Sequence, residues 1–387
     1  MKSENPEIKQ VLERSVDQIL PQKQGLADLM SRRKIRLYNG IDPTGSKLHL
    51  GHTVSLRKLQ EFADLGHEAI LVIGTGTVLA GDPSLRDEAR PRISQEEIEN
   101  NIKTWKEQAG KVLDFSKVKI RYNGEWLLKL GLKEVIDIAS HISAIKLFQR
   151  EMFQRRIKKG DTVWMSETLY PLLQGYDSVA LDTDLEIGGT DQVFNMLIGR
   201  ELQSKINKKD KFVMTLPMIL GVDGKTMSKT SGNCVWLDDS ADQMFGKIMS
   251  MPDTIVPDYF KVLTRVSLEE IKNISPLESK TRLASEIVTL YHGKAEASRA
   301  SQEFNRVFKE KGLPSNVPEI FIKEKEVELL DLLVRLKMAA SKAEARRLVE
   351  QGGVSIGKDI QKEWQKTVKI KKNEIIRVGK RKFVKII

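Results

Sequence analysis

Two histidines, His49 and His52, lie three residues apart in the stretch "LHLGHTVSLRKLQEFADLG", with Gly51 between them. Metal sites on one helix face typically use histidines four residues apart with a glutamate, and no third ligand is evident here. An isolated pair of this kind is more often an ordinary surface or core feature. Imidazole N–H groups at the start of a helix can also donate to a phosphate. The pair alone leaves these alternatives open.

A second stretch favours the phosphate interpretation. The segment "GVDGKTMSKTSGN", residues 221 to 233, is a glycine-flanked loop that carries Lys225, Ser228, Lys229 and Thr230. A reaction in which negative charge builds on phosphates needs positioned donors more than a proton shuttle. Histidines at a helix start and lysines on a mobile loop would supply such donors.

The elements that must position these residues follow an α/β pattern. Residues 35 to 41 are strand-like, residues 52 to 66 form an amphipathic helix closed by Gly66, and "EAILVIGT" is typical of a buried parallel strand. A second unit has a strand at residues 185 to 187, the turn "GGTDQ" and a helix over residues 193 to 206. We therefore expect a Rossmann-type parallel sheet that binds ligands at the carboxyl ends of its strands. A dehydrogenase is disfavoured because no G-x-G-x-x-G opens the first helix.

Length and composition limit the number of domains and the classes of protein that the chain can belong to. A chain of 387 residues exceeds the size of a single core, so two or three domains are expected. Cys234 is the only cysteine, which excludes an internal disulfide and a cysteine-clustered zinc site. No apolar run reaches the roughly 20 residues of a membrane span, and the first residues lack a secretory signal pattern. These features predict a cytoplasmic protein without a membrane segment or a metal site.

The positive charge is concentrated near the C-terminus. Residues 321 to 387 hold 18 of the lysines and arginines against 9 acidic residues, so they carry most of the formal net charge of +11. A helix beginning after Ser341 carries Lys342, Arg346 and Arg347 on one face, and short β-type runs follow it. This compact basic module predicts a polyanionic partner.

Three regions are expected along the chain. Residues 1 to 235 form the Rossmann-type domain, with a helical insertion at about residues 95 to 165. Residues 236 to 320 form an α-helical domain that ends in the linker "EKGLPSNVPEIFI". Residues 321 to 387 form the small basic α+β module.

Together the motifs resemble those of class I aminoacyl-tRNA synthetases. "HLGH" is similar to the motif known as HIGH and "KTMSKT" to the motif known as KMSKS. "YNGIDPTGSKLHLGH", "GDPS", "YPLLQGYDS" and "GGTDQ" occur in the order of the tyrosyl-tRNA synthetase family, and the basic module resembles an S4 RNA-binding domain. The resemblance covers nearly the whole chain.

The resemblance implies a role for each site residue. His49, His52, Lys225, Lys229 and Thr44 would act on the phosphates. Asp177 and Tyr38 would bind the phenolic hydroxyl of tyrosine, whereas Asp82, Tyr170 and Gln174 would receive its ammonium group, with Gln192 nearby. The ATP side would comprise Gly40, Asp42, Gly51, Gly189, Asp191, Arg86, Arg90, Ser228 and Thr230.

The implied reaction joins L-tyrosine and Mg-ATP to tyrosyl-adenylate and then transfers tyrosine to tRNA(Tyr). A homodimer is implied as well, with its contact in residues 95 to 165. The basic run from Lys146 to Lys159 could lie beside the tRNA or form a solvated helix face.

Two alternatives stay open at this point. Tryptophanyl-tRNA synthetase shares the core, although Tyr38, Asp177 and the S4-like module favour tyrosine. The chain could instead be a synthetase-like RNA-binding protein that has lost catalysis, because Thr226 stands where the family has a second lysine.

Overall fold

The computed structural model describes residues 5–84, 93–227, 232–308, 317–357, 359–379 and 382–387. The chain divides into two compact units, Met1–Ala297 and Ser298–Ile387. Within the described residues, none of the helices is both long enough and apolar enough to cross a bilayer.

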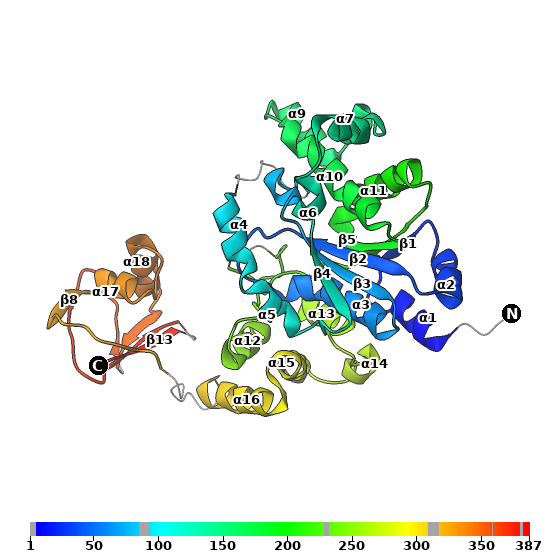
Figure 1. Cartoon of the computed structure of the whole chain (residues 1–387). Helices are drawn as coiled ribbons and strands as arrows, with labels where there is room; N and C mark the ends of the chain where they lie inside the picture. The colour runs from blue at the N-terminus through cyan, green and yellow to red at the C-terminus, as the bar shows by residue number, and fades with distance from the viewer. Residues whose placement is uncertain (1–4, 85–92, 228–231, 309–316, 358, 380–381) are drawn as a thin grey trace. The chain divides into compact units, whose positions relative to one another are not determined.

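A six-stranded sheet forms the centre of the first unit (Figure 1). Five of its strands are parallel, and the edge strand β1 runs antiparallel to β6. In spatial order the strands are β1 (Gln18–Leu20), β6 (Phe212–Leu216), β5 (Leu185–Gly189), β2 (Arg36–Ile41), β3 (Glu68–Ile73) and β4 (Val118–Tyr122). The chain builds outward from β2 toward β4 and later from β5 toward β6, so the strand order reverses between β2 and β5. A crevice for ligands is expected at the carboxyl ends of these two strands.

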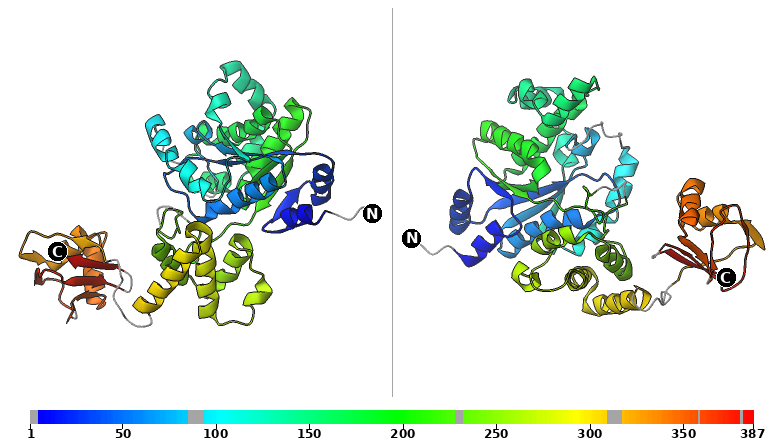
Figure 2. Two further views of the ribbon diagram at one scale, coloured as in Figure 1. Left: turned by 60° about the horizontal axis from the view of Figure 1, so that its bottom comes forward. Right: turned by 180° about the vertical axis from the view of Figure 1, so that it is seen from behind.

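Helices cover both faces of this sheet (Figures 1 and 2). α3 (Leu50–Asp64) lies on one face and buries Leu50, Val54, Leu59 and Phe62. α10 (Met165–Leu181) and α11 (Val193–Ile206) pack together on the other face. These two helices approach closely where Gly175 meets Gly199. A Cβ added to Gly175 would lie 3.1 Å from the backbone nitrogen of Gly199.

The segment before α10 is mostly helical, as the sequence predicts, but it also contains β4. This strand pairs in parallel with β3 and therefore belongs to the central sheet. Its sequence VKIRY alternates apolar or aromatic residues with charged ones, the pattern of a half-exposed strand, so a signal for β4 was present in the sequence. The helices of this segment are α4 (Gln95–Ile102), α5 (Trp105–Gly110), α6 (Gly124–Leu127), α7 (Leu132–Ser140), α8 (Ala144–Phe148) and α9 (Glu151–Lys159).

Short helices flank these elements at both ends of the first unit. At the N-terminus, α1 (Pro6–Glu13) and α2 (Lys23–Arg32) bury Leu12 and Leu26. The region after residue 236 is helical, as expected, and packs against the rest of the unit, since the Tyr259 hydroxyl donates to the Leu220 carbonyl at 2.5 Å. Its helices are α12 (Ala241–Met249), α13 (Val256–Leu263), α14 (Leu268–Ile271) and α15 (Pro276–His292), and most of the next helix, α16 (Lys294–Phe308), belongs to the second unit.

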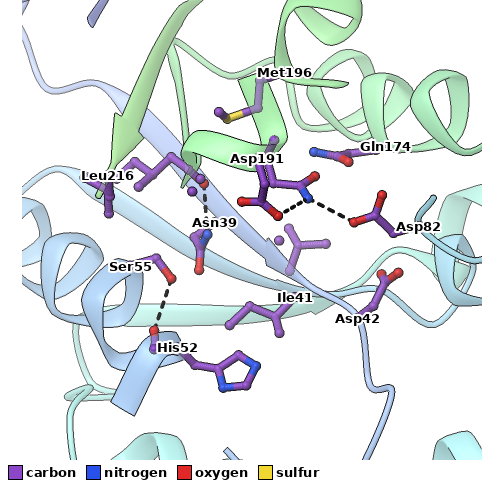
Figure 3. Close-up of a pocket in the computed structure, with 18 of the residues that line it drawn as sticks. Asn39, Ile41, Asp42, His52, Ser55, Asp82, Gln174, Asp191, Met196 and Leu216 are labelled. Carbon is purple, nitrogen blue, oxygen red and sulfur yellow. Dashed lines mark hydrogen bonds between the residues drawn. The ribbon is translucent and has the colours of Figure 1, made fainter. Parts of the chain in front are cut away.

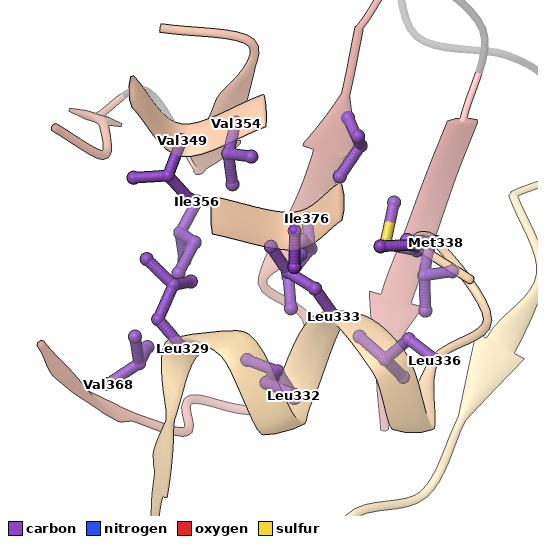
Figure 4. Close-up of a cluster of buried hydrophobic side chains, with 14 of the residues drawn as sticks. Leu329, Leu332, Leu333, Leu336, Met338, Val349, Val354, Ile356, Val368 and Ile376 are labelled. Carbon is purple, nitrogen blue, oxygen red and sulfur yellow. The ribbon is translucent and has the colours of Figure 1, made fainter. Parts of the chain in front are cut away.

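The second unit has its own hydrophobic core, which α17 (Leu329–Arg335), α18 (Lys342–Glu350) and the strands enclose (Figure 4). Ser341 caps α18, and its hydroxyl accepts from the Glu344 N–H at 3.2 Å, as predicted. Part of the predicted linker is a strand, because β7 pairs in parallel with β13. The strands are β7 (Glu319–Ile320), β8 (Glu326–Glu328), β9 (Val354–Ile356), β10 (Asp359–Ile360), β11 (Thr367–Lys369), β12 (Ile375–Val378) and β13 (Lys382–Ile386).

A buried ion pair joins α9 to α10 and generates a prediction about stability. Arg156 donates to both carboxylate oxygens of Glu167, at 2.6 and 3.0 Å, and both side chains are almost fully buried. Replacing Glu167 by leucine leaves a buried guanidinium without its carboxylate, so we expect the free energy of unfolding to fall by about 3 to 5 kcal/mol. Urea unfolding followed by circular dichroism measures this loss.

The matched control is Glu13→Ala, which removes one partner of the exposed ion pair between Lys23 and Glu13. Solvent screens that pair, so the urea midpoint should stay at the wild-type value. Equal midpoints for the Glu167→Leu and Glu13→Ala variants would contradict the importance of the buried pair.

Candidate active site

A cavity of about 290 Å³ opens at the carboxyl ends of β2 and β5, where the strand order reverses. Figure 3 shows its wall, with His52 on one side and the carboxylates of Asp82 and Asp191 on another. The structure brings most of the predicted site residues together here. These lining residues are Gly40, Asp42, Thr44, His49, Gly51, His52, Asp82, Tyr170, Gln174, Asp177, Gly189, Asp191 and Gln192.

His49 and His52 form the first turn of α3. His49 is the N-cap, and its Nδ1 accepts from the Gly51 N–H at 3.1 Å. The Nδ1 of His52 accepts from the His49 N–H at 3.1 Å, and the two rings lie 3.8 Å apart. Because each Nδ1 is an acceptor, the proton of each neutral imidazole sits on Nε2. Both histidines line the cavity, where a proton on Nε2 suits donation to an anion.

The residues that follow the loop 221–233 form backbone contacts with the first turn of α3. The Leu50 N–H donates to the Val235 carbonyl at 3.0 Å, and His49 forms a β-bridge with Trp236. Met227 of the loop lines the cavity, and its sulfur lies 3.5 Å from the position of a Cβ on Gly51. These contacts bring two stretches that are far apart in sequence to one side of the cavity.

Lys225 is a predicted basic residue of the site that the structure describes, and it is not among the cavity-lining residues. Lys225 is exposed, and its backbone N–H donates to Asp223 at 3.0 Å. Arg86, Arg90, Ser228, Lys229 and Thr230 lie outside the described residues, as does Leu85, the residue that follows "GDPS". Their predicted roles stay predictions.

A hydrogen-bonded chain of polar side chains crosses the cavity wall. Asp42 accepts from the hydroxyl of Thr77 at 2.7 Å and from that of Tyr170 at 3.0 Å. Asn123 donates to Thr77 at 3.0 Å and to Asp177 at 3.1 Å. Both carboxylates are thus oriented by neutral donors.

Gly74 keeps space beside Asp42. A Cβ at this position would lie 1.9 Å from Asp42 Oδ1 and 2.4 Å from the Thr77 hydroxyl. The segment "GTGTVLAG" contains two threonines, and Thr77 is the one that lines the cavity. Thr75 instead accepts from the Gly124 N–H at 2.9 Å and is not a lining residue.

Asp82 and Gln192 form a second polar group on the wall. The Gln192 amide donates to Asp82 at 2.9 Å and to Asp191 at 3.0 Å, and Asp82 also accepts from the Ser84 N–H at 2.9 Å (Figure 3). Asp82, Asp191 and Asp42 give this part of the cavity an acidic wall that suits a cationic group.

Asp177 is buried, and burial raises its pKa well above the usual value of an aspartate. Hydrogen bonds from Asn123 at 3.1 Å and from the Trp126 indole at 2.8 Å act against this rise. The carboxyl group is therefore held in one orientation at the end of the cavity wall.

The structure places Tyr38 differently from the expectation. Tyr38 is fully buried, its hydroxyl lies 2.8 Å from the Ser178 hydroxyl, and it does not line the cavity. Successive side chains of a strand point to opposite sides, and it is the next residue, Asn39, that reaches the cavity. Burial, together with the charges of Glu186 and Asp177, raises the pKa of Tyr38, so the phenol stays neutral.

Several lining residues were not predicted from the sequence, among them Asn39, Gly74, Asn123 and Glu186. Two of them carry a signal that could have been used. Asn123 directly follows β4, at the ligand-binding edge of a parallel sheet. Glu186 is a charged residue within the otherwise apolar strand β5.

The three basic residues predicted for RNA binding lie on α18 and are exposed. Lys342 pairs with Asp331 at 2.5 Å, and Arg346 pairs with Glu350 at 2.8 Å while lying over the ring of Trp364. Arg347 shares this exposed helix surface.

Comparison with known proteins agrees with this geometry. Residues 30–309 match the family model described as tRNA synthetases class I (W and Y), and residues 309–386 match that of the tyrosine–tRNA ligase SYY-like C-terminal domain. The tyrosine–tRNA ligase of Thermotoga maritima is 42% identical over 386 residues, covering 97% of this chain and 96% of that protein. That of Mannheimia succiniciproducens is 41% identical and covers 97% of both chains.

Solved structures share the fold at lower identity. A C-terminally truncated mitochondrial tyrosyl-tRNA synthetase from Aspergillus nidulans aligns with a TM-score of 0.67 at 23% identity, covering 78% of this chain and 94% of that one. The Archaeoglobus fulgidus tyrosyl-tRNA synthetase, solved with L-tyrosine, aligns with a TM-score of 0.62 at 21% identity, covering 76% and 99%. The chain therefore belongs to the tyrosine–tRNA ligase family of the class I aminoacyl-tRNA synthetases.

Proposed function

We propose that this chain activates L-tyrosine with ATP to give tyrosyl-adenylate and pyrophosphate, and then transfers tyrosine to the 3′-terminal adenosine of tRNA(Tyr). The observation that carries the proposal is a single cavity with two histidines on one side, whose Nδ1 atoms are occupied as acceptors, and buried carboxylates on another. The family match over nearly the full chain supports the same reaction and favours tyrosine over tryptophan.

The ATP side of the cavity would contain the first turn of α3. His49 and His52 would donate to the phosphates, with Thr44, Lys225 and Lys229 as further donors. Gly51 keeps this turn open, because a Cβ there would lie 2.9 Å from the His49 ring. Gly40, Asp42, Gly189, Asp191, Arg86, Arg90, Ser228 and Thr230 complete the proposed ATP site.

The tyrosine side would contain Asp82 of the acidic wall, together with residues of α10. Asp82, Tyr170 and Gln174 would receive the ammonium group, with Gln192 holding Asp82 in place. Asp177 would meet the phenolic hydroxyl, with Asn123 and Trp126 holding its carboxyl group. Tyr38, which was also expected at the phenolic hydroxyl, would support this end of the site from behind Ser178.

The proposed chemistry needs no side chain as a general base, since the tyrosine carboxylate is itself the nucleophile. Alignment of the two substrates and donors to the phosphates would supply most of the rate. No group of three or more His, Cys, Asp or Glu in the described part of the chain could hold a metal ion. We therefore propose that Mg²⁺ enters the site bound to the ATP phosphates, as is usual for this ion.

The partners outside the cavity are assigned from exposed surfaces. The exposed basic face of α18 would bind tRNA phosphates through Arg347, Arg346 and Lys342. A homodimer would cover the exposed apolar side chains near α6 to α10, and a monomeric mass in sedimentation equilibrium would contradict it. These apolar side chains are Leu128, Leu132, Ile136, Ile145, Trp164 and Met165. A tRNA-charging enzyme of this kind would work in the cytoplasm.

The first prediction concerns the amino acid. ATP–pyrophosphate exchange should proceed with tyrosine and stay at background with phenylalanine, tryptophan or no amino acid. Phenylalanine would leave the buried Asp177 carboxyl without its partner, which costs binding energy. Exchange with tryptophan would favour a tryptophanyl-tRNA synthetase, and no exchange with any amino acid would favour an RNA-binding protein that has lost catalysis.

The second prediction concerns Asp42. Gly74→Ala places a methyl group against Asp42 and Thr77, so the cavity wall must shift. We expect tyrosine-dependent exchange to fall by at least about tenfold, because small displacements of a positioned group are costly. Gly246→Ala is the matched control, since a Cβ there meets nothing within 4 Å. That variant should keep normal exchange, and an equally active Gly74→Ala variant would contradict the role of this wall.

The third prediction concerns the C-terminal residues 321 to 387. Removing residues 321–387 deletes nearly all of the C-terminal hydrophobic core and α18, but no residue that lines the cavity. Tyrosine-dependent exchange should persist, whereas aminoacylation at limiting tRNA should fall by at least about tenfold, because phosphate contacts are lost. Unchanged charging by the truncated chain would refute an RNA-binding role for residues 321 to 387.

A further inference from the structure

Lys211 is a fully buried lysine that does not line the cavity. It lies directly before β6, and its ammonium group donates to the Glu186 carboxylate and, at 2.5 Å, to the Ser178 hydroxyl. Glu186 is also buried, on the neighbouring strand β5, but it reaches the cavity wall. The pair therefore connects the interior of the sheet to the proposed tyrosine site.

Helix α11 leaves space for this ammonium group at Gly199. A Cβ on Gly199 of α11 would lie 2.7 Å from Lys211 Nζ and 2.9 Å from the Ser178 hydroxyl. Burial lowers the pKa of Lys211, and the charge of Glu186 opposes that effect. Burying two ionised groups costs free energy unless they pair closely, so neither group is stable here without the other.

Glu186 in turn orients Gln174. The Gln174 amide nitrogen donates to Glu186 Oε1 at 3.1 Å, and a carboxylate can only accept this bond. The amide oxygen of Gln174 therefore points away from Glu186. This oxygen is buried and has no hydrogen-bond partner among the described residues, yet Gln174 lines the same cavity as Asp191 and Asp82 (Figure 3). A buried acceptor without a donor is costly, and a substrate ammonium group would supply that donor.

We infer that Lys211 is a positioning residue for tyrosine, because it holds Glu186, which holds the Gln174 amide with its oxygen ready to accept from the substrate ammonium group. This inference rests on the proposed function, since it takes the ligand of Gln174 to be the amino group of tyrosine. Lys211 does not line the cavity and acts on the ammonium side through Glu186 and Gln174, whereas its bond to Ser178 leads toward Tyr38.

The first test is Lys211→Met in the full chain. We expect the KM for tyrosine in pyrophosphate exchange, and the Kd of L-tyrosine by isothermal titration calorimetry, to rise by about tenfold or more, the value of one charge-assisted hydrogen bond. The KM for ATP and kcat should change by less than about threefold, since the histidine side is untouched.

The matched control is Lys58→Met. Lys58 is another buried lysine, paired with Glu61 at 2.6 Å and bonded to the Val11 and Arg14 carbonyls, but it lies outside the cavity wall. This variant should lose stability while keeping the wild-type KM for tyrosine. An equal rise in that KM for both variants would show a general effect of losing a buried lysine and overturn the inference.

Two double variants keep the test decisive even if Lys211→Met does not fold. Glu186→Gln with Lys211→Met removes both charges but keeps an acceptor for Gln174, so this variant should lose less affinity for tyrosine than Lys211→Met alone. Glu186→Leu with Lys211→Met removes the acceptor as well, so the Kd of tyrosine should rise by about tenfold. Equal affinities in the two double variants would overturn the inference.

A Gln174→Ala background completes the design. In the Gln174→Ala variant, adding Lys211→Met should change the Kd of tyrosine by less than about twofold, because the Gln174 amide through which Lys211 acts is absent. A further tenfold loss would overturn the inference. Failure of the proposed function would appear separately, as absence of tyrosine-dependent exchange in the wild-type chain.

Discussion

The reversal of strand order between β2 and β5 is the constraint on which the site depends. Helices leave these two parallel strands toward opposite faces of the sheet, so their carboxyl ends are left uncovered and a cavity forms there. The first turn of α3 follows β2 and presents His49 and His52 to this space. Asp82, Gln192 and Asp191 reach it from the connections that follow β3 and β5. Most of the remaining elements either cover the sheet or hold these connections in place.

Charge is distributed around the cavity in a way that suits two different ligand groups. Asp82 lies on the side assigned to the tyrosine ammonium group, while His49 and His52 lie on the side assigned to the phosphates, with their Nδ1 atoms occupied as acceptors. A concentration of buried carboxylates is unstable without compensation. Neutral donors orient Asp42 and Asp177, and the ammonium group of Lys211 balances Glu186. The excess positive charge is instead concentrated in residues 321 to 387.

Much of the catalytic fold could be predicted from local patterns. The predicted strand at residues 35 to 41 and the predicted helix at 193 to 206 match β2 and α11 within one residue. The alternating sequence VKIRY of β4 is a strand signal that was not used, whereas β7 has only two residues and depends on its pairing with the distant strand β13. The site residues on α10 could be predicted as a group because Tyr170, Gln174 and Asp177 lie three and four residues apart, on one helix face.

The sequence by itself determined the family, the parallel-sheet architecture and the two motif-bearing stretches, because these depend on residue types at short spacings. Tertiary structure alone decided which side of β2 faces the cavity, and it placed Asn39 there instead of Tyr38. It also decided that Lys211, which sits in the basic stretch "NKKDKF", is buried against Glu186. The physical reason is that strand register and helix approach are set by packing between distant segments, which no local pattern encodes.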